Sequence, residues 1–372
     1  HAPGVAAYLP LRHEGGDMLT PAPEQVPFDL AMAVLRPLLA DPAVLKVLHN
    51  AKYDLEVLGR DVNGGLEVSP VDDTMLISYS MDAGRHGHGM DELSRRHLSH
   101  QPVTYDEITG TGRARKPFAQ IPLDTATAYA AEDADVTLRL WHALRPKLRE
   151  EKALALYENV ERRMITVLHD MEVAGVKVDG PALKQTGAEF TERMAALEKE
   201  IHGIAGEPFA VGSPKQLGDI LFGKLGMQGG KKGKSGAYST DAATLEELAA
   251  STGHALPRKV LDWRQLSKLN STYVEGLQAQ LAHDGRVHTD FSMAITSTGR
   301  LSSTEPNLQN IPIRTEEGAR IRRAFVAEEG HRLLAADYSQ IELRLLAHVA
   351  QVPSLLEAFS TGQDIHARTA SD

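Results

Sequence analysis

Apolar residues in the first sixty positions follow two different spacings in turn. Residues 5–10 and 45–49 are short apolar runs of the kind that form strands, whereas residues 27–39 between them carry apolar side chains at helical spacing. A second helix is expected directly after the strand at 45–49. Strands that alternate with helices favour an α/β layer arrangement for this part of the chain.

The middle of the chain has the pattern of consecutive helices. Gly175 ends a charged helix that carries an apolar stripe, and Ser213 followed by Pro214 provides an N-cap and a first helical position. Residues 229–236, rich in glycine and lysine, predict a flexible basic loop that either keeps the surface soluble or contacts phosphate. Helices are predicted over residues 123–149, 150–174, 180–204, 213–225 and 257–281.

Short strands are predicted again in the last third of the chain. Residues 286–293 and 294–298 predict two paired strands. Residues 298–314 form a loop dense in Ser, Thr, Asn and Gln, a composition that suits neither a packed core nor a linker. Residues 333–336 are a continuous apolar run typical of a buried strand, and from Ser339 onward apolar residues recur at helical spacing, with Ser339 as the expected N-cap.

Asp337 lies at the junction of this predicted strand and helix. A carboxylate at the carboxyl edge of a sheet and beside a helix N-terminus suits a hard divalent cation, which takes oxygen ligands and often keeps substrate phosphates in its remaining positions. The alternative interpretation is that Asp337 only begins a turn. Its position alone does not decide between the two.

Composition limits the possible classes of protein without assigning one. The 372 residues suffice for two or three domains, and the absence of cysteine excludes a disulfide framework and thiolate metal sites. No apolar run reaches the roughly 18 residues of a membrane span. The net charge of −10 argues weakly against nucleic-acid binding, because phosphate contacts depend on where the cations lie rather than on their sum.

The residues that follow the apolar run carry a specific resemblance. The string Asp337-Tyr338-Ser339-Gln340-Ile-Glu342-Leu-Arg resembles the first metal-binding palm motif of family A DNA polymerases, the bacterial DNA polymerase I type. The resemblance implies that Asp337 is a catalytic metal ligand and that the next residues bind the incoming nucleotide. Glu342 would lie beneath its sugar and exclude a 2′-hydroxyl, although helix capping alone would also explain this residue.

A shorter match follows toward the end of the chain. The string Asp364-Ile-His366-Ala-Arg-Thr-Ala resembles the segment that opens the next helix of the same family. It implies that His366 lies near the triphosphate, whereas the alternative is an ordinary surface histidine.

Two segments of the first 149 residues resemble the proofreading 3′–5′ exonucleases with an acidic two-metal centre. The second and third motifs of that family are similar to Asn50-Ala-Lys-Tyr-Asp54 and to Tyr129-x-x-x-Asp133. Tyr129 and Asp133 are four residues apart and share one helix face, which a solvated surface would also explain. The resemblance implies that Asp54 and Asp133 hold divalent metal ions while Tyr129 orients the attacking water.

The first motif of these exonucleases is missing from the sequence. It is an Asp-x-Glu that supplies the ligand shared by both metals, and none precedes Asn50. We therefore expect that the chain is a fragment beginning just after this motif, and that Asp54 and Asp133 alone do not assemble both metals.

The polar loop and the last long helix of the middle region extend the polymerase resemblance. Thr298-Gly-Arg300-Leu-Ser-Ser resembles a family block whose arginine contacts the primer terminus, and Lys268-Leu-Asn-Ser-Thr-Tyr273 resembles its primer-strand contact segment. Amide and guanidinium groups suit minor-groove acceptors, which look alike in every base pair. DNA contacts are expected at Lys268, Ser271, Thr272, Arg300, Asn307, Gln309, Asn310 and Arg314.

Together these motifs imply a multidomain α/β and α+β protein. We expect a ribonuclease H-like 3′–5′ exonuclease domain over residues 1–149, a connecting helix over 150–179, a helical thumb over 180–282, and a partial palm with the start of the fingers over 283–372. The second palm carboxylate and the triphosphate-binding fingers helix of the family lie downstream of such a fragment. The fragment is therefore expected to be inactive alone.

The implied activity is that of a DNA-directed DNA polymerase, a nucleotidyltransferase of replication and repair with a proofreading exonuclease. Mg²⁺, primer–template DNA and deoxynucleoside triphosphates are the implied cofactor and partners. A monomer without membrane contact is expected, in the bacterial cytoplasm at the nucleoid. Two alternatives stay open: a stand-alone 3′–5′ exonuclease, which has no use for residues 286–348, and a catalytically silent DNA-binding protein.

Overall fold

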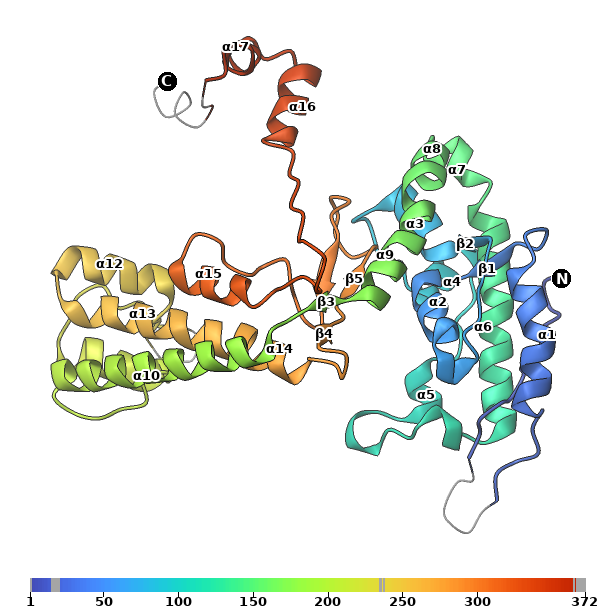
Figure 1. Ribbon diagram of the computed structural model, residues 1–372, viewed down its shortest axis with the longest axis horizontal. Coiled ribbons are helices and arrows are strands. Elements are labelled where there is room, and N and C mark those ends of the chain that lie inside the picture. Colours follow the sequence, from blue (N-terminus) through green and yellow to red (C-terminus); the bar gives the residue numbers. More distant parts are fainter. Residues whose placement is uncertain (1, 15–20, 234–235, 237, 364, 366–372) are drawn as a thin grey trace. The chain divides into compact units, whose positions relative to one another are not determined.

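The computed structural model describes residues 2–14, 21–233, 236, 238–363 and 365. The chain divides into two compact units, His1–Phe325 and Val326–Asp372, which are considered separately. Helices dominate both, and the sheets of the described residues are three pairs of short strands (Figure 1). No helix among the described residues is long and apolar enough to cross a membrane.

The N-terminal part of the first unit is built around the parallel pair of β1 and β2, in which Lys46 lies opposite Val71. The predicted helix at 27–39, the strand at 45–49 and the helix after it are confirmed as α1, β1 and α2. The elements in order are α1 (Phe28–Ala40), β1 (Lys46–Leu48), α2 (Ala51–Gly59), η1 (Asp61–Asn63), β2 (Val71–Asp73), α3 (Thr74–Asp82), α4 (Met90–Leu98), α5 (Tyr105–Thr109), η2 (Gly112–Ala114), η3 (Phe118–Gln120) and α6 (Leu123–Leu144).

The strand predicted at residues 5–10 is wrong. These residues have no regular structure, and Val5 is 68% exposed. A strand is stable only when a neighbour takes up its backbone hydrogen bonds, and no described strand pairs with this segment.

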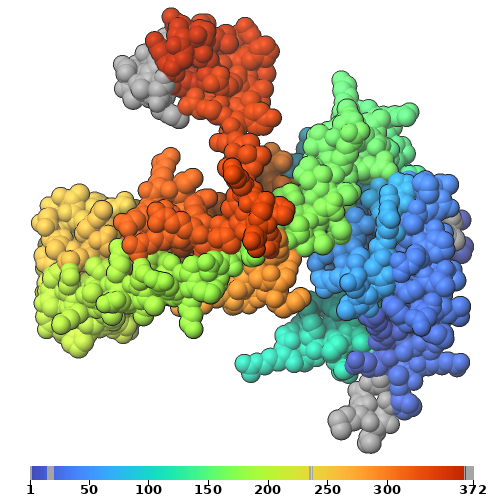
Figure 2. Space-filling model, viewed as in Figure 1, coloured from blue at the N-terminus to red at the C-terminus, as the bar shows by residue number. Residues whose placement is uncertain are grey.

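The two helices predicted over 123–174 form in shorter pieces. Pro146 lacks an N–H and its ring clashes with the preceding turn, so α6 stops at Leu144 and α7 (Lys147–Glu150) follows. The next helix starts later than predicted, as α8 (Leu154–Leu156), a π-turn η4 (Tyr157–Glu161) and α9 (Arg162–Ala174). Figure 2 shows the green surface of α9 beside the blue residues of α2, against which it packs.

A helical arm follows, in which α10 lies along α13 (Figure 1). The predicted N-cap is confirmed, because the Ser213 hydroxyl accepts a hydrogen bond from the Gln216 amide. The helices predicted over 180–204, 213–225 and 257–281 are also confirmed. The elements are α10 (Gly180–Ala205), α11 (Pro214–Gly218), η5 (Asp219–Lys224), α12 (Ala242–Thr252), α13 (Ala255–Leu269), η6 (Asn270–Glu275) and α14 (Gly276–Ala279).

The strands after the arm pair differently from the prediction. β3 (Val176–Lys177) joins β4 (Arg286–Val287), and β5 (Asp290–Ser292) pairs antiparallel with β6 (Ser302–Thr304) rather than with residues 294–298. Residues 294–298 instead belong to the connection, which is closed where the Thr296 hydroxyl donates to the Arg300 carbonyl at 2.6 Å. α15 (Glu316–Arg323) ends the first unit.

The second unit contains two helices, α16 (Ile341–Val349) and α17 (Pro353–Thr361). The buried strand predicted at 333–336 is wrong, because no described strand pairs with these residues and Leu334 is 93% exposed. Ser339 is not the N-cap either. Gln340 occupies that position in the left-handed region at φ 54°, without a capping side-chain hydrogen bond.

Three large apolar clusters stabilise the first unit. One fills the N-terminal part and extends to Tyr157 and Met293, the second joins the base of the arm to Val287 and Ile311, and the third fills the far end of the arm. The first cluster therefore combines residues separated by more than 200 positions in the sequence.

We predict that Tyr157→Phe lowers the stability of the first cluster. Tyr157 is fully buried, and its hydroxyl donates to Asp72 Oδ1 and accepts from the Asp73 amide, both at 3.0 Å. Loss of the hydroxyl removes the side-chain partner of the buried Asp73 amide and one partner of Asp72, which keeps Arg162 at 3.1 Å from its Oδ1. Loss of the partner of a buried donor costs about 1–3 kcal/mol. Urea denaturation measures the loss, with the exposed Tyr105→Phe as control. Equal unfolding midpoints for the two variants would contradict the prediction.

Candidate functional site

Asp73 organises the start of α2, the helix that carries Asp54. Its carboxylate accepts hydrogen bonds from the amides of Asn50 at 3.2 Å and Ala51 at 2.8 Å, and it also caps α3 through the amide of Met75 at 2.8 Å. Burial raises the pKa of Asp73 to about 6, although these backbone hydrogen bonds oppose the rise. One buried carboxylate thus fixes the N-termini of two helices.

The three predicted exonuclease residues are half-buried on α2 and α6. Burial, with Asp73 as a second cause, raises the pKa of Asp54 to about 7, and burial raises that of Asp133 to about 6 against a hydrogen bond from Tyr129. The pKa of Tyr129 is raised by burial and then by Asp133. Tyr129 and Asp133 therefore act on one another, as their spacing predicts.

These residues do not make a complete metal site by themselves. The described part of the chain contains no group of three His, Asp or Glu side chains placed to hold one ion. Two partly desolvated carboxylates have the right oxygen chemistry for a divalent cation, which would supply an activated water, but not enough ligands.

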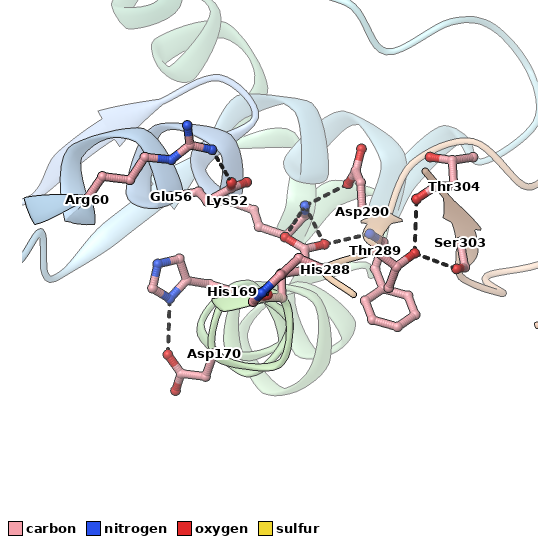
Figure 3. Close-up of polar contacts among 12 residues, drawn as sticks. Lys52, Glu56, Arg60, His169, Asp170, His288, Thr289, Asp290, Ser303 and Thr304 are labelled. Atoms are coloured by element: carbon pink, nitrogen blue, oxygen red, sulfur yellow. Dashed lines mark hydrogen bonds and ion pairs between the residues drawn. The ribbon is translucent and has the colours of Figure 1, made fainter. Parts of the chain in front are cut away.

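The polar loop over residues 298–314 is held in place by hydrogen bonds to the hydroxyls of Thr289 and Ser303. The Thr289 hydroxyl lies 2.7 Å from the Ser303 hydroxyl and 2.7 Å from the Pro306 carbonyl, and Ser303 Oγ accepts from the Leu308 amide at 3.1 Å. Thr289 and Ser303 are buried (Figure 3). This network orders the loop while its other polar side chains face outward.

The structure brings the last long helix of the arm against the same loop. The Tyr273 hydroxyl donates to the Asn310 carbonyl, and Leu269, Tyr273 and Ile311 belong to one apolar cluster. Arg322 donates to the Ile311 carbonyl at 2.7 Å. Two segments predicted to contact DNA are thereby joined. Their exposed members are Lys268, Ser271, Thr272, Asn307, Gln309, Asn310 and Arg314.

The remaining predicted residues are distributed over both units. Arg300 is an exposed residue of the first unit, at the end of the connection between β5 and β6. His366 lies outside the described residues. In the second unit, Asp337, Tyr338, Ser339 and Glu342 are exposed and Gln340 is half-buried.

Sequence reasoning missed the ion cluster formed by buried Lys52 and Glu172 with the more exposed Asp290, which we call the Lys52 joint. Lys52 Nζ lies 2.8 Å from both Glu172 oxygens and 2.9 Å from Asp290 Oδ1 (Figure 3). Burial lowers the pKa of Lys52, but the hydrogen bonds that it donates to the two carboxylates, together with their negative charge, outweigh burial and raise the pKa overall. The two carboxylates lie 120 and 238 positions from Lys52 in the sequence, so no local pattern pairs them with it. The one available signal was a lysine in a segment that otherwise enters the core at Ala51.

A cavity of about 1360 Å³ adjoins the Lys52 joint and is lined partly by histidines. Among them, His88 is buried, its Nδ1 lies 2.9 Å from the Ser78 hydroxyl, and its Nε2 has no hydrogen-bond partner in the described structure. Burial, and next the neighbouring His86, lower the pKa of His88 to about 4.

Comparison with known proteins decides the family. The family model described as DNA polymerase family A matches residues 181–372. This chain belongs to DNA polymerase family A. A second family model, described as 3′-5′ exonuclease, matches residues 1–149. The predicted fold class, an exonuclease domain followed by family A polymerase elements, is therefore confirmed.

Relatives of this family A chain extend the match over nearly its whole length. It is 52% identical to DNA polymerase I of Rhizobium leguminosarum and 45% identical to that of Pseudomonas aeruginosa, over 99% of the chain in both cases. It spans 36% and 40% of the length of these relatives. Families of this kind use divalent metal ions.

A solved structure supports the same assignment. The structure described as "POL domain of Pol1 from M. smegmatis complex with DNA primer-template and dNTP" matches this chain at a TM-score of 0.78 with 37% identity. The match covers 95% of this chain and 57% of the other. The likeness therefore includes both the exonuclease and the polymerase elements.

We predict that His88 makes this chain sensitive to acid. The pKa of His88 is about 4 in the folded protein and near 6.5 when unfolded, so the unfolded state takes up the proton first. The free energy of unfolding should fall as the pH decreases from 6.5 to 4, and His88→Gln should remove at least about 1.4 kcal/mol of that fall, the equivalent of one pKa unit. Urea denaturation at pH 7.5 and 5 tests this, with the exposed His283→Gln as control. Equal pH dependence in both variants would be the contrary result.

Proposed function

We propose that this chain is the exonuclease, thumb and first palm part of a bacterial DNA polymerase of replication and repair. The complete enzyme adds deoxynucleotides to a primer 3′-end by attack of the 3′-hydroxyl on the α-phosphate, and it proofreads with the exonuclease domain. The observation that carries the proposal is the joining of residues 268–273 to residues 307–314 through Tyr273 and one apolar cluster. This arrangement presents exposed ammonium, hydroxyl, amide and guanidinium groups in two adjacent segments.

Donors of this kind bind phosphate and sugar oxygens and minor-groove acceptors without reading the base sequence. A polymerase needs such contacts, because it copies any template. We assign Arg300 to the primer terminus, and Asn307, Gln309, Asn310 and Arg314 to template or primer. Lys268, Ser271 and Thr272 bind the primer backbone.

We assign binding of the incoming nucleotide to residues of the second unit. Asp337 provides one carboxylate for Mg²⁺, and Glu342 excludes a ribose 2′-hydroxyl. The incoming nucleotide is bound by Tyr338, Ser339, Gln340 and His366.

In the exonuclease, Asp54 and Asp133 are metal ligands and Tyr129 orients water. The exposure of Asp337 supports its access to a bound ion, and the loss of water around Asp54 and Asp133 favours a cation beside them.

The proposed domains are the exonuclease over residues 1–149, the connecting helix over 150–179, the thumb over 180–282, and the partial palm with the start of the fingers over 283–372. The matches to residues 1–149 and 181–372 support the boundaries at residues 149 and 180. We propose a monomer located in the bacterial cytoplasm at the nucleoid.

We predict that Arg300→Ala weakens binding of a recessed primer–template about tenfold, since loss of one charged contact of about 1.4 kcal/mol has that effect. Fluorescence anisotropy at fixed salt, with and without Mg²⁺, measures the Kd. Arg113→Ala, which removes an exposed arginine of the exonuclease domain, serves as control. An equal loss in both variants would show that Arg300 acts only through overall charge.

Asp337→Asn should abolish nucleotide addition in a version of this chain extended at its C-terminus along its reading frame. The reason is that the amide cannot replace a charged metal ligand. Primer extension should fall by a factor of at least about 100, as for loss of a group that stabilises the transition state. Glu329→Gln, at an exposed position, should remain active. If the extended chain itself incorporates nothing, the silent DNA-binding alternative is favoured.

A further inference from the structure

The Lys52 joint connects three elements that the sequence separates widely. Lys52 comes from α2 of the exonuclease part, Glu172 from α9, and Asp290 from β5. The side chains of Lys52 and Glu172 are 8% and 4% exposed, and Glu172 Oε1 also accepts a hydrogen bond from the Phe291 amide at 2.5 Å. Figure 3 shows Lys52 and Asp290 pointing toward one another across this contact.

The connection between β5 and β6, residues 293–301, packs on the exonuclease part at further points. Met293 is 5% exposed and belongs to the first apolar cluster, which combines residues of the exonuclease part with Tyr157 and Leu168, and Ala294 and Leu301 pack against this cluster. The Tyr79 hydroxyl on α3 donates to the Thr296 carbonyl at 2.8 Å. Both ends of the connection therefore pack on the first apolar cluster, and its middle accepts a hydrogen bond from α3.

Gly84 provides the closest approach. At φ +75° it lies so near the connection that an added Cβ would be 2.4 Å from Ser297 Cβ. No side chain fits there without displacing Ser297, because real Cβ atoms do not approach that closely. The backbone of the exonuclease part at Gly84 therefore packs directly on the 293–301 connection at Ser297.

Lys52 and Asp54 lie on opposite faces of α2. Lys52 and Asp54 are two residues apart, which places them about 200° apart around the helix. Lys52 therefore contacts the hairpin of β5 and β6 from one face of α2. Asp54 lies on the opposite face of α2, which the proposed exonuclease site uses. One short helix serves both parts of the protein.

We propose that the exonuclease fold positions the 293–301 connection, and with it Arg300, through the Lys52 joint and the contact of Gly84 with Ser297. Lys52, Glu172 and Gly84 are positioning residues for the primer-binding loop, and none of them contacts the primer. The inference rests on the proposed function only where it assigns Arg300 to the primer terminus. The placement of the connection itself is independent of that assignment.

Gly84→Ala is the first test, with Gly112→Ala as its matched control. Both glycines have positive φ, +75° and +60°, so both substitutions strain the backbone in the same way, but an added Cβ meets nothing within 4 Å at Gly112. We expect the backbone amides of residues 290–304 to exchange hydrogen about tenfold faster in Gly84→Ala, as measured by mass spectrometry on the whole chain. In Gly112→Ala, exchange in this region should stay unchanged.

Glu172→Gln tests the Lys52 joint without changing the side-chain volume. It removes the charge that neutralises buried Lys52, and it weakens the hydrogen bond to the Phe291 amide. The same region should exchange faster. Asp170→Asn, two residues away on α9 with a side chain that is 70% exposed, is the control that should leave the exchange unchanged. Circular dichroism sets a temperature at which all four variants are folded.

The affinity of the two test variants for DNA then distinguishes the positioning of the connection from the role proposed for Arg300. Both test variants should bind a recessed primer–template more weakly while keeping their affinity for a blunt duplex of equal length, a difference that general loss of stability would not produce. Unchanged exchange at residues 290–304 in both variants would overturn the inference. Faster exchange with unchanged primer–template affinity would support the positioning of the connection and overturn the role proposed for Arg300.

Discussion

The buried ion pair between Lys52 and Glu172 constrains the structure of the whole first unit. Removing an ammonium and a carboxylate from water costs several kcal/mol for each ion, and this is offset only where their geometry is close to ideal. Both Glu172 oxygens and Asp290 meet Lys52 at 2.8 to 2.9 Å. Because these residues come from α2, α9 and β5, a shift of any one element would lengthen these contacts. Through Asp290 and the Phe291 amide, this cluster joins the exonuclease part to the hairpin of β5 and β6.

The order set at this hairpin extends into the proposed DNA-binding surface. Thr289 directly precedes Asp290, and its hydroxyl joins Ser303 and the Pro306 carbonyl in a buried network. Farther along the loop, Tyr273 holds Asn310. The polar loop is therefore fixed at one end by the exonuclease side and at the other by the helical arm. Such a loop can present flexible polar side chains on a rigid backbone, as a surface that binds any DNA sequence requires.

Local patterns in the sequence predicted what depends on local structure. The helices at 27–39 and 180–204 and the cap at Ser213 follow from side-chain spacing and capping within one turn, and the family followed from the order of its motifs. The failures involve partners far away in the sequence. Residues 333–336 have the composition of a strand, but composition does not supply a neighbouring strand. The partner of β5 and the two carboxylates of Lys52 could not be predicted for the same reason.

Photo-cross-linking of the primer terminus tests most directly whether the ordered polar loop binds DNA. A primer with a photoreactive base at its 3′-end is annealed to a template, bound to this chain and irradiated, and the cross-linked peptides are identified by mass spectrometry. The account predicts cross-links to residues 300–314, which the hairpin and the arm hold in place. Cross-links confined to residues 1–149, with none in the loop, would contradict it.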